Sequence, residues 1–107
     1  MIVKLNKQMP YQNIKPDNIY FVIGIEADYY RIINDLGKPY LYPPNIFHVI
    51  DDSEPNDWST EYGEDGERYS YPIDLNEAGF FEDYFDGKED AISLFWYIIN
   101  QRLAKAA

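Results

Sequence analysis

Apolar and β-branched runs in the first fifty residues predict five short β-strands. The runs are bounded by Pro, Gly, Asn and Asp, as strands of small β-proteins are, and they cover residues 2–5, 19–26, 29–34, 39–42 and 46–50. Gly24 interrupts the longest run, which predicts a bulge or a sharp bend. Asn34-Asp35-Leu36-Gly37 favours a hairpin turn in which Gly37 takes a positive φ. Five short strands joined by tight turns indicate a small, strongly bent barrel.

The pattern is less regular between residue 51 and residue 78. Residues 58–62 and 67–71 flank Gly-Glu-Asp-Gly, which is compatible with a second hairpin and equally with an ordered loop held by its aromatic side chains. Residues 80–85, FFEDYF, predict a short helical turn. Residues 8–18 contain two prolines and several turn formers, and we expect a loop there.

The last twenty residues carry the clearest helical signal. Apolar side chains recur at three- and four-residue steps from residue 87 to residue 105, which predicts an amphipathic helix. Asp86 and Glu89 have the spacing of a capping box, with Asp86 as the N-cap. We therefore expect one mainly β domain with added α structure: a five-stranded barrel over 1–50, an acidic aromatic-rich connection over 51–86 and a C-terminal helix over 87–105.

Charge divides the chain unevenly. The net charge is -10, and residues 51–90 hold fifteen acidic side chains against two basic ones. Phosphate binding depends on Lys and Arg, so this balance disfavours nucleic acid and favours a basic protein partner. The acidic surface that we expect to face such a partner comprises Asp51, Asp52, Glu54, Asp57, Glu61, Glu64 and Asp65. The alternative is that the acidity serves solubility alone.

Residues suited to catalysis are scarce. The chain has no cysteine and one histidine, His48, which we expect at the surface of a short strand. No phosphate-binding fingerprint, nucleophile motif or metal-ligand spacing is present, so we expect no cofactor and no metal. No apolar run has the length of a membrane span, and the start of the chain lacks a signal-peptide core. We expect a cytoplasmic protein that does not bind membranes.

Aromatic residues are the most suggestive feature of the composition. Eleven Tyr, six Phe and two Trp exceed what a core of this size can hide completely. Tyr and Trp are enriched at protein interfaces because they supply rigid contact area with a polar tip. One interpretation is an aromatic binding face built from Tyr29, Tyr40, Tyr42 and Trp58. The other is that the tyrosines cover a small core and keep their hydroxyls in water.

Residues 28–50 carry a resemblance to the second half of an SH3-like barrel. Asp28-Tyr29-Tyr30 resembles the aromatic pair that opens the third strand of SH3 domains, and Pro43-Pro44-Asn45-Ile46-Phe47 resembles the proline-asparagine turn before the last strand. The chain is also similar to uncharacterised small bacterial SH3-like proteins with Tyr-Arg-Ile followed by Tyr-Leu-Tyr-Pro-Pro. The resemblance implies a peptide groove at Tyr29 and Pro43, with Ile46 at the third position, where SH3 domains have a tyrosine.

Together these features favour a non-enzymatic protein-binding module from a bacterium. The charge asymmetry points to an inhibitor or immunity-type role toward a basic partner. Two other classes stay open: a small enzyme that uses paired carboxylates, and a structural domain that oligomerises through the helix. The sequence does not indicate the oligomeric state.

Overall fold

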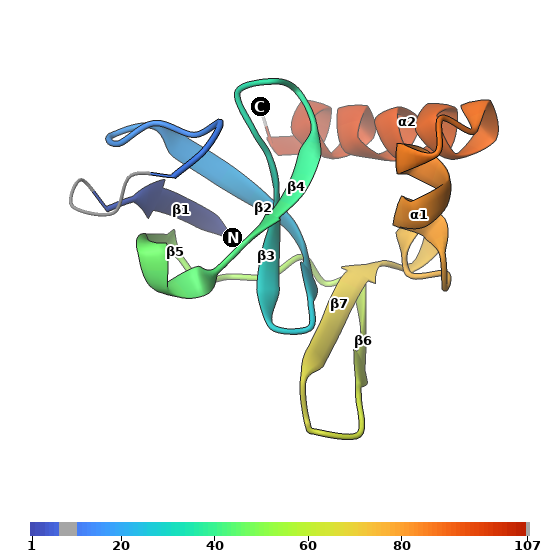
Figure 1. Ribbon diagram of the computed structural model, residues 1–107, viewed down its shortest axis with the longest axis horizontal. Helices are drawn as coiled ribbons and strands as arrows, with labels where there is room; N and C mark the ends of the chain where they lie inside the picture. Colours follow the sequence, from blue (N-terminus) through green and yellow to red (C-terminus); the bar gives the residue numbers. More distant parts are fainter. Residues whose placement is uncertain (7–10, 107) are drawn as a thin grey trace. The chain divides into compact units, whose positions relative to one another are not determined.

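Seven strands and two α-helices follow one another along the chain in a computed structural model that describes residues 1–6 and 11–106 (Figure 1). Residues 8–10 of the predicted loop over 8–18 lie outside the described residues. The strands are β1 (Ile2–Leu5), β2 (Ile19–Glu26), β3 (Tyr29–Ile33), β4 (Pro39–Tyr42), β5 (Phe47–Asp51), β6 (Trp58–Tyr62) and β7 (Arg68–Pro72). The chain forms two compact units, Met1–Pro72 and Ile73–Ala107.

The strands of the first unit form one antiparallel sheet. Its main path runs β4-β3-β2-β1-β5, and β7 pairs with both β2 and β6. Strand β2 connects the two parts of the sheet, because residues 19–21 pair with β1 whereas Ile25 and Glu26 pair with β7. Each of these pairings is antiparallel.

The mainly β class with a C-terminal helix is confirmed, and the five predicted strands are present. The sheet is larger than predicted, because residues 58–72 form a hairpin whose second strand joins β2. It is also open: among the described strand pairings none connects β4 with β5. The pairing decides between the two interpretations of residues 58–71, in favour of the hairpin.

Two hairpin turns position the strands around β3. The register of β2 and β3 shifts between Val22 and Gly24, which confirms the predicted bulge. Ala27 and Asp28 both have positive φ, 50° and 68°, as a two-residue turn of the primed type requires. Gly37 has a φ of 74° and confirms the predicted turn before β4. The amide oxygen of Asn34 stabilises that turn by accepting hydrogen bonds from the backbone N–H groups of Leu36 and Lys38.

The core of the first unit lies against one face of this sheet. Among the described residues, its buried members are Val3, Leu5, Ile14, Tyr20, Val22, Ile25, Ile32, Tyr42 and Ile46. Partly buried Tyr30, Tyr40, Phe47 and Trp58 pack against them. Aromatic rings therefore contribute much of the apolar area that stabilises this small unit, as the composition indicates.

The second unit contains α1 (Phe80–Phe85), α2 (Glu89–Ala106) and the short 3-10 turn Ile73–Leu75. Rings from both helices pack edge to face: Phe81 and Tyr84 of α1 lie 5.9 Å and 5.1 Å from Phe95 of α2 between ring centroids. The predicted helical turn over 80–85 and the final amphipathic helix are thus both present. Buried Phe95, Ile98 and Ile99 lie on the stripe that the sequence predicts.

The predicted N-cap of the last helix is wrong. Asp86 is the C-cap of α1, and its backbone N–H donates to Glu82 O at 2.9 Å. Gly87 then takes a φ of 80°, and α2 begins at Glu89. Asp86 and Glu89 do have the spacing of a capping box. Asp86 nevertheless belongs to the end of α1, because this helix ends where the following glycine can adopt the left-handed conformation.

Candidate functional site

The predicted aromatic face does not form one surface. Tyr30 and Ile32 of β3 pair with Tyr42 and Tyr40 of β4, so these four side chains share the core face of the sheet. Tyr29 precedes Tyr30 and points to the opposite face, where its side chain is 47% exposed. Strand alternation therefore separates Tyr29 from the other members of the predicted set.

Tyr42 is a core residue. Its side chain is 2% exposed, and its hydroxyl accepts a hydrogen bond from Asn34 Nδ2 at 3.2 Å and donates one to Gln12 O at 3.1 Å. Burial raises the pKa of this phenol above its ordinary value. A hydroxyl held by these two partners positions the loop before β2, and the ring has no surface to offer a partner protein.

Tyr40, Pro43 and Trp58 are half-buried. Tyr40 and Trp58 both pack against the core cluster, so only part of each ring is accessible. Ile46, the third position of the groove that the SH3 resemblance implies, is 3% exposed. Of the five aromatic and proline residues predicted to bind a partner, Tyr29 alone is exposed.

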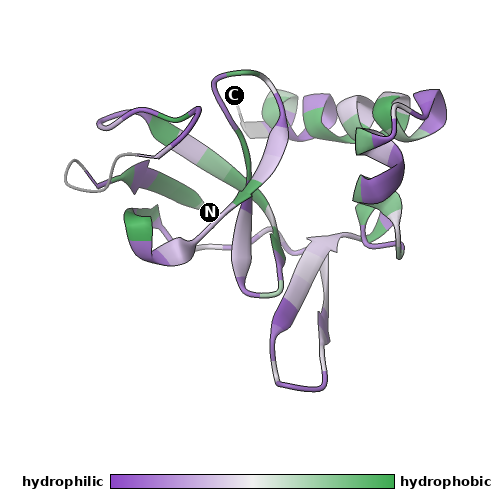
Figure 2. Cartoon of the chain, in the orientation of Figure 1, coloured by the Kyte–Doolittle hydropathy of each residue, from purple (hydrophilic) through white to green (hydrophobic). Residues whose placement is uncertain are grey.

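The predicted acidic residues divide between two regions of the first unit. Asp51, Asp52, Glu54 and Asp57 belong to the end of β5 and the segment before β6, whereas Glu61, Glu64 and Asp65 belong to the β6–β7 hairpin. All except Glu54 are exposed. Figure 2 shows hydrophilic residues around the turn of this hairpin, which extends away from the other strands of its unit.

Asp51 is engaged in a local turn. Its Oδ1 atom accepts hydrogen bonds from the hydroxyl of Ser53 at 2.6 Å and from the backbone N–H of Ser53 at 2.9 Å. These two bonds, the one from the hydroxyl first, lower the pKa of the Asp51 carboxyl. The carboxylate stays charged and orders the chain as it leaves β5.

Glu54 is half-buried and paired. Both of its carboxylate oxygens accept hydrogen bonds from the guanidinium of Arg68, with one N–O distance of 2.8 Å. This bidentate pair lowers the pKa of Glu54 and raises that of Arg68. Much of the negative charge of Glu54 is therefore neutralised within the protein, and this residue contributes little to an acidic surface.

The turn of the β6–β7 hairpin is built from glycines and one carboxylate. Gly66, with a φ of 80°, donates its N–H to Gly63 O at 3.1 Å, and Gly63 donates to Glu67 O at 2.9 Å. Glu67 accepts a hydrogen bond from the backbone N–H of Asp65 at 3.1 Å. A Cβ on Gly63 would lie 1.3 Å from Glu67 Oε1. This tight turn places the side chains of Glu64 and Asp65 at the exposed end of the hairpin.

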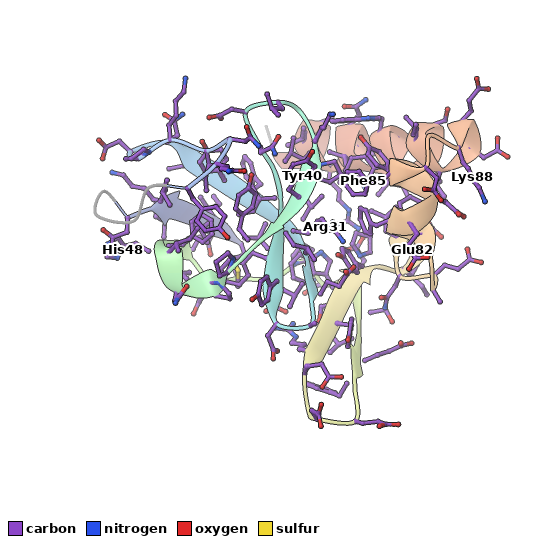
Figure 3. All side chains as sticks on the ribbon, viewed as in Figure 1. Arg31, Tyr40, His48, Glu82, Phe85 and Lys88 are labelled. Atoms are coloured by element: carbon purple, nitrogen blue, oxygen red, sulfur yellow. The ribbon has the colours of Figure 1, made fainter. Side chains whose placement is uncertain are left out.

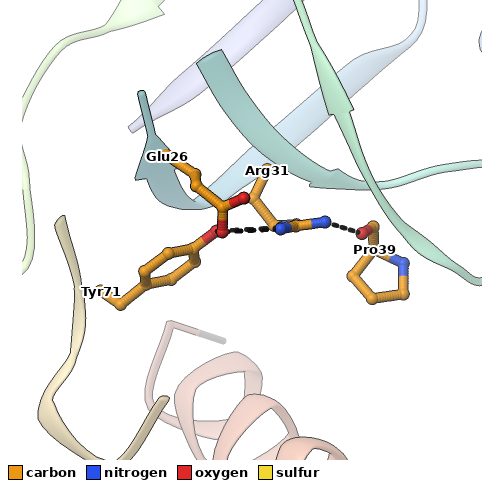
Figure 4. A network of polar contacts seen from close by, with 4 residues as sticks. All are labelled: Glu26, Arg31, Pro39 and Tyr71. Atoms are coloured by element: carbon orange, nitrogen blue, oxygen red, sulfur yellow. Dashed lines mark hydrogen bonds and ion pairs between the residues drawn. The ribbon is translucent and has the colours of Figure 1, made fainter. Parts of the chain in front are cut away.

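Sequence reasoning missed a buried polar network centred on Arg31. The side chain of Arg31 is 4% exposed, and it donates to Tyr71 Oη at 3.0 Å, Pro39 O at 2.8 Å and Glu26 Oε1 at 2.9 Å (Figure 4). Tyr71 in turn donates to Glu26 Oε1 at 3.0 Å, and burial raises its pKa well above the ordinary tyrosine value. One arginine thereby connects β2, β3, β4 and β7.

Only part of this network has a sequence signal. Arg31 is the single charge in the apolar run YYRII, and Glu26 lies across the two-residue turn from it. Tyr71 lies forty positions away from Arg31 and looks like any other tyrosine of the chain. The network holds β7 against the sheet and so determines where the acidic hairpin projects.

His48 and Arg31 lie in contrasting environments. His48 is exposed on β5, as predicted, whereas Arg31 lies among the strands (Figure 3).

Within residues 1–6 and 11–106, no three His, Cys, Asp or Glu side chains group as metal ligands do. In the same part of the chain, no helix is both long and apolar enough to cross a membrane.

Comparison of the chain with protein-family models finds no match, and comparisons with curated proteins and with solved structures find no significant match.

Proposed function

We propose that β1–β5 form an SH3-like small barrel to which the β6–β7 hairpin is added. Three features support this assignment. Strand β2 is shared between two parts of the sheet in the order β4-β3-β2-β1-β5. The aromatic pair Tyr29-Tyr30 opens the third strand. Pro44–Ile46 forms a 3-10 turn that leads directly into β5, the last strand of this set.

We further propose that the protein is a non-enzymatic binding module for a basic protein, with an inhibitor or immunity-type role in the bacterial cytoplasm. The observation that carries this proposal is the exposed acidic hairpin. Glu61, Glu64 and Asp65 lie on it without an ion pair to any described residue, in contrast to Glu54, which Arg68 neutralises. Unpaired exposed carboxylates create a negative potential that attracts and orients a positively charged surface.

The peptide groove of SH3 domains is a less suitable site for this partner. Buried Ile46 replaces the tyrosine that the groove needs, and Tyr42 is also buried. The hairpin instead combines charge with exposed aromatic area, because Tyr62 on β6 is 70% exposed. An exposed tyrosine on the same hairpin as the exposed carboxylates Glu61, Glu64 and Asp65 suits the surface of a basic protein, which offers arginine side chains for stacking and ion pairing.

The proposal is tested with the native partner, captured from the host of origin and then purified. Binding by the wild type should weaken at least about tenfold between 50 mM and 300 mM salt, since exposed ion pairs are screened. The triple variant Glu61→Gln/Glu64→Gln/Asp65→Asn should bind at least about tenfold more weakly at low salt. A matched control replaces Asp74, Glu77 and Glu82 of the second unit by their amides. Affinity that is indifferent to salt and equal in the two variants would contradict the proposal.

A further inference from the structure

Strand β6 forms an edge of the sheet. Among the described strand pairings β6 pairs with β7 alone, in the register Trp58↔Pro72 to Tyr62↔Arg68. An edge strand presents a row of backbone N–H and C=O groups that a further strand can pair with. The opposite edge strands are less suited to this: β4 begins with proline, and β5 carries a bulge in its pairing with β1.

The hairpin geometry shows which backbone groups of β6 face outward. Gly63 donates to Glu67 O, so residues 63 and 67 form a hydrogen-bonded pair. Pairs alternate along an antiparallel ladder, so Glu61↔Tyr69 is again hydrogen-bonded and Thr60↔Ser70 and Tyr62↔Arg68 are not. The N–H and C=O groups of Thr60 and Tyr62 therefore point away from β7. Both residues are exposed.

Charge decides which kind of strand can use this edge. Glu61 lies on β6 itself, and Glu64 and Asp65 lie at the adjoining turn. A second copy of the chain would bring the same carboxylates together and would add its own net charge of -10, so pairing of two β6 strands is repelled. An added cationic strand is attracted instead, because a Lys or Arg opposite Glu61 lies near an unpaired carboxylate.

From these observations we infer that the outer edge of β6 binds an extended Lys- or Arg-containing segment of a partner protein as an additional strand. The inference rests on the proposed function, since it requires a basic partner, and it specifies how that partner is held. Backbone hydrogen bonds to Thr60 and Tyr62 provide the affinity, as in other cases of strand addition. Glu61 and the ring of Tyr62 point to opposite faces of the sheet, so each contacts the side chains of the added strand on its own face and selects among them.

The test uses two synthetic peptides and two variants at position 60. The first peptide is acetylated, amidated (Lys-Val)4, and the second is the same peptide with every backbone N–H methylated. Thr60→Pro removes the outward N–H without removing a β6–β7 bond, because Thr60 and Ser70 form a non-hydrogen-bonded pair. Proline is accepted at such a position of an edge strand. Thr60→Val is the matched control, since it keeps the N–H and loses only the 2.8 Å contact between the hydroxyls of Thr60 and Ser70.

Strand addition predicts that the wild type and Thr60→Val bind the unmethylated peptide at least about tenfold more tightly than the methylated one. Thr60→Pro should bind the methylated and the unmethylated peptide with equal affinity, because it lacks the outward N–H of position 60. Equal affinity of the wild type for the two peptides would overturn strand addition and leave the charge-based proposal standing. No binding of either peptide would overturn both. If Thr60→Pro does not fold, the affinity ratio in the wild type and peptide-induced amide shifts at Thr60 and Tyr62 decide the question.

Discussion

Gly24 of β2 leaves room for the ring of Tyr71 of β7. A Cβ atom placed on Gly24 would lie 2.1 Å from Tyr71 Cδ1 and 3.1 Å from Ser70 O. The ring cannot move aside, because its hydroxyl is held by Arg31 and Glu26. The glycine that the sequence marks as a bulge is therefore also the place where the hairpin docks on the sheet.

Gly24→Ala should lower the free energy of unfolding by about 2 kcal/mol, the usual cost of overpacking a rigid contact. Urea denaturation measures this change. The cost should fall by more than half in a Tyr71→Ala background, where the ring is gone. Equal costs in the two backgrounds would show that another contact, such as Ser70 O, is responsible.

Arg31→Met should be the most destabilising change in the buried network, by about 3 kcal/mol or more. It leaves the carboxylate of Glu26, the hydroxyl of Tyr71 and the carbonyl of Pro39 without their shared donor. Tyr71→Phe removes one hydroxyl and should cost about 1–2 kcal/mol. Urea denaturation of both variants gives the order. A larger cost for Tyr71→Phe would contradict the central position of the arginine.

Ala27→Gly should stabilise the protein by about 0.5–1 kcal/mol. Ala27 has a φ of 50°, in the left-handed region that a residue with a Cβ avoids and glycine adopts freely. Thermal denaturation should show a higher Tm. Asp28→Ala at the neighbouring position should act in the opposite direction, because Asp28 Oδ1 accepts a hydrogen bond from the N–H of Arg68 at 2.9 Å. A lower Tm for Ala27→Gly would show that the turn needs its side chain.

The pair of Glu54 and Arg68 should make stability depend on acid pH. Arg68 lowers the pKa of Glu54 in the folded state, so the pair stabilises the protein above the ordinary glutamate pKa of 4.5 and loses this effect as the pH falls through the folded value. The stability difference between the wild type and Glu54→Gln should therefore be constant near neutral pH and shrink below about 4.5. Urea denaturation from pH 7 to pH 2.5 measures it.

The control for this pH dependence is the Arg68→Met background. Without the guanidinium, the stability change caused by Glu54→Gln should lose most of its variation with pH, since the hydrogen bonds from Arg68 are the largest cause of the lowered pKa of Glu54. A pH dependence of the same size in both backgrounds would assign the effect to other acidic groups.

Local patterns are sufficient to predict most elements of the fold. Strands over residues 2–50, the bulge at Gly24, the turn at Gly37 and the last helix all follow from them, because each depends on residues within a few positions of one another. The prediction for Asp86 is wrong because it also relied on a local pattern. Asp86 can end α1 or begin α2, and the residues around it do not show which of the two it does.

Residue patterns along the chain were enough to place the first five strands and the two helices and to show that the carboxylates gather after residue 50. Only folding in three dimensions settled that β7 joins β2, that Tyr42 is buried while Tyr29 is exposed, and that Arg68 neutralises Glu54. The cause of this division is distance along the chain. Tyr71 meets Arg31 across forty positions and Glu26 across forty-five, and such contacts depend on sheet pairing and on which side chains the core can enclose.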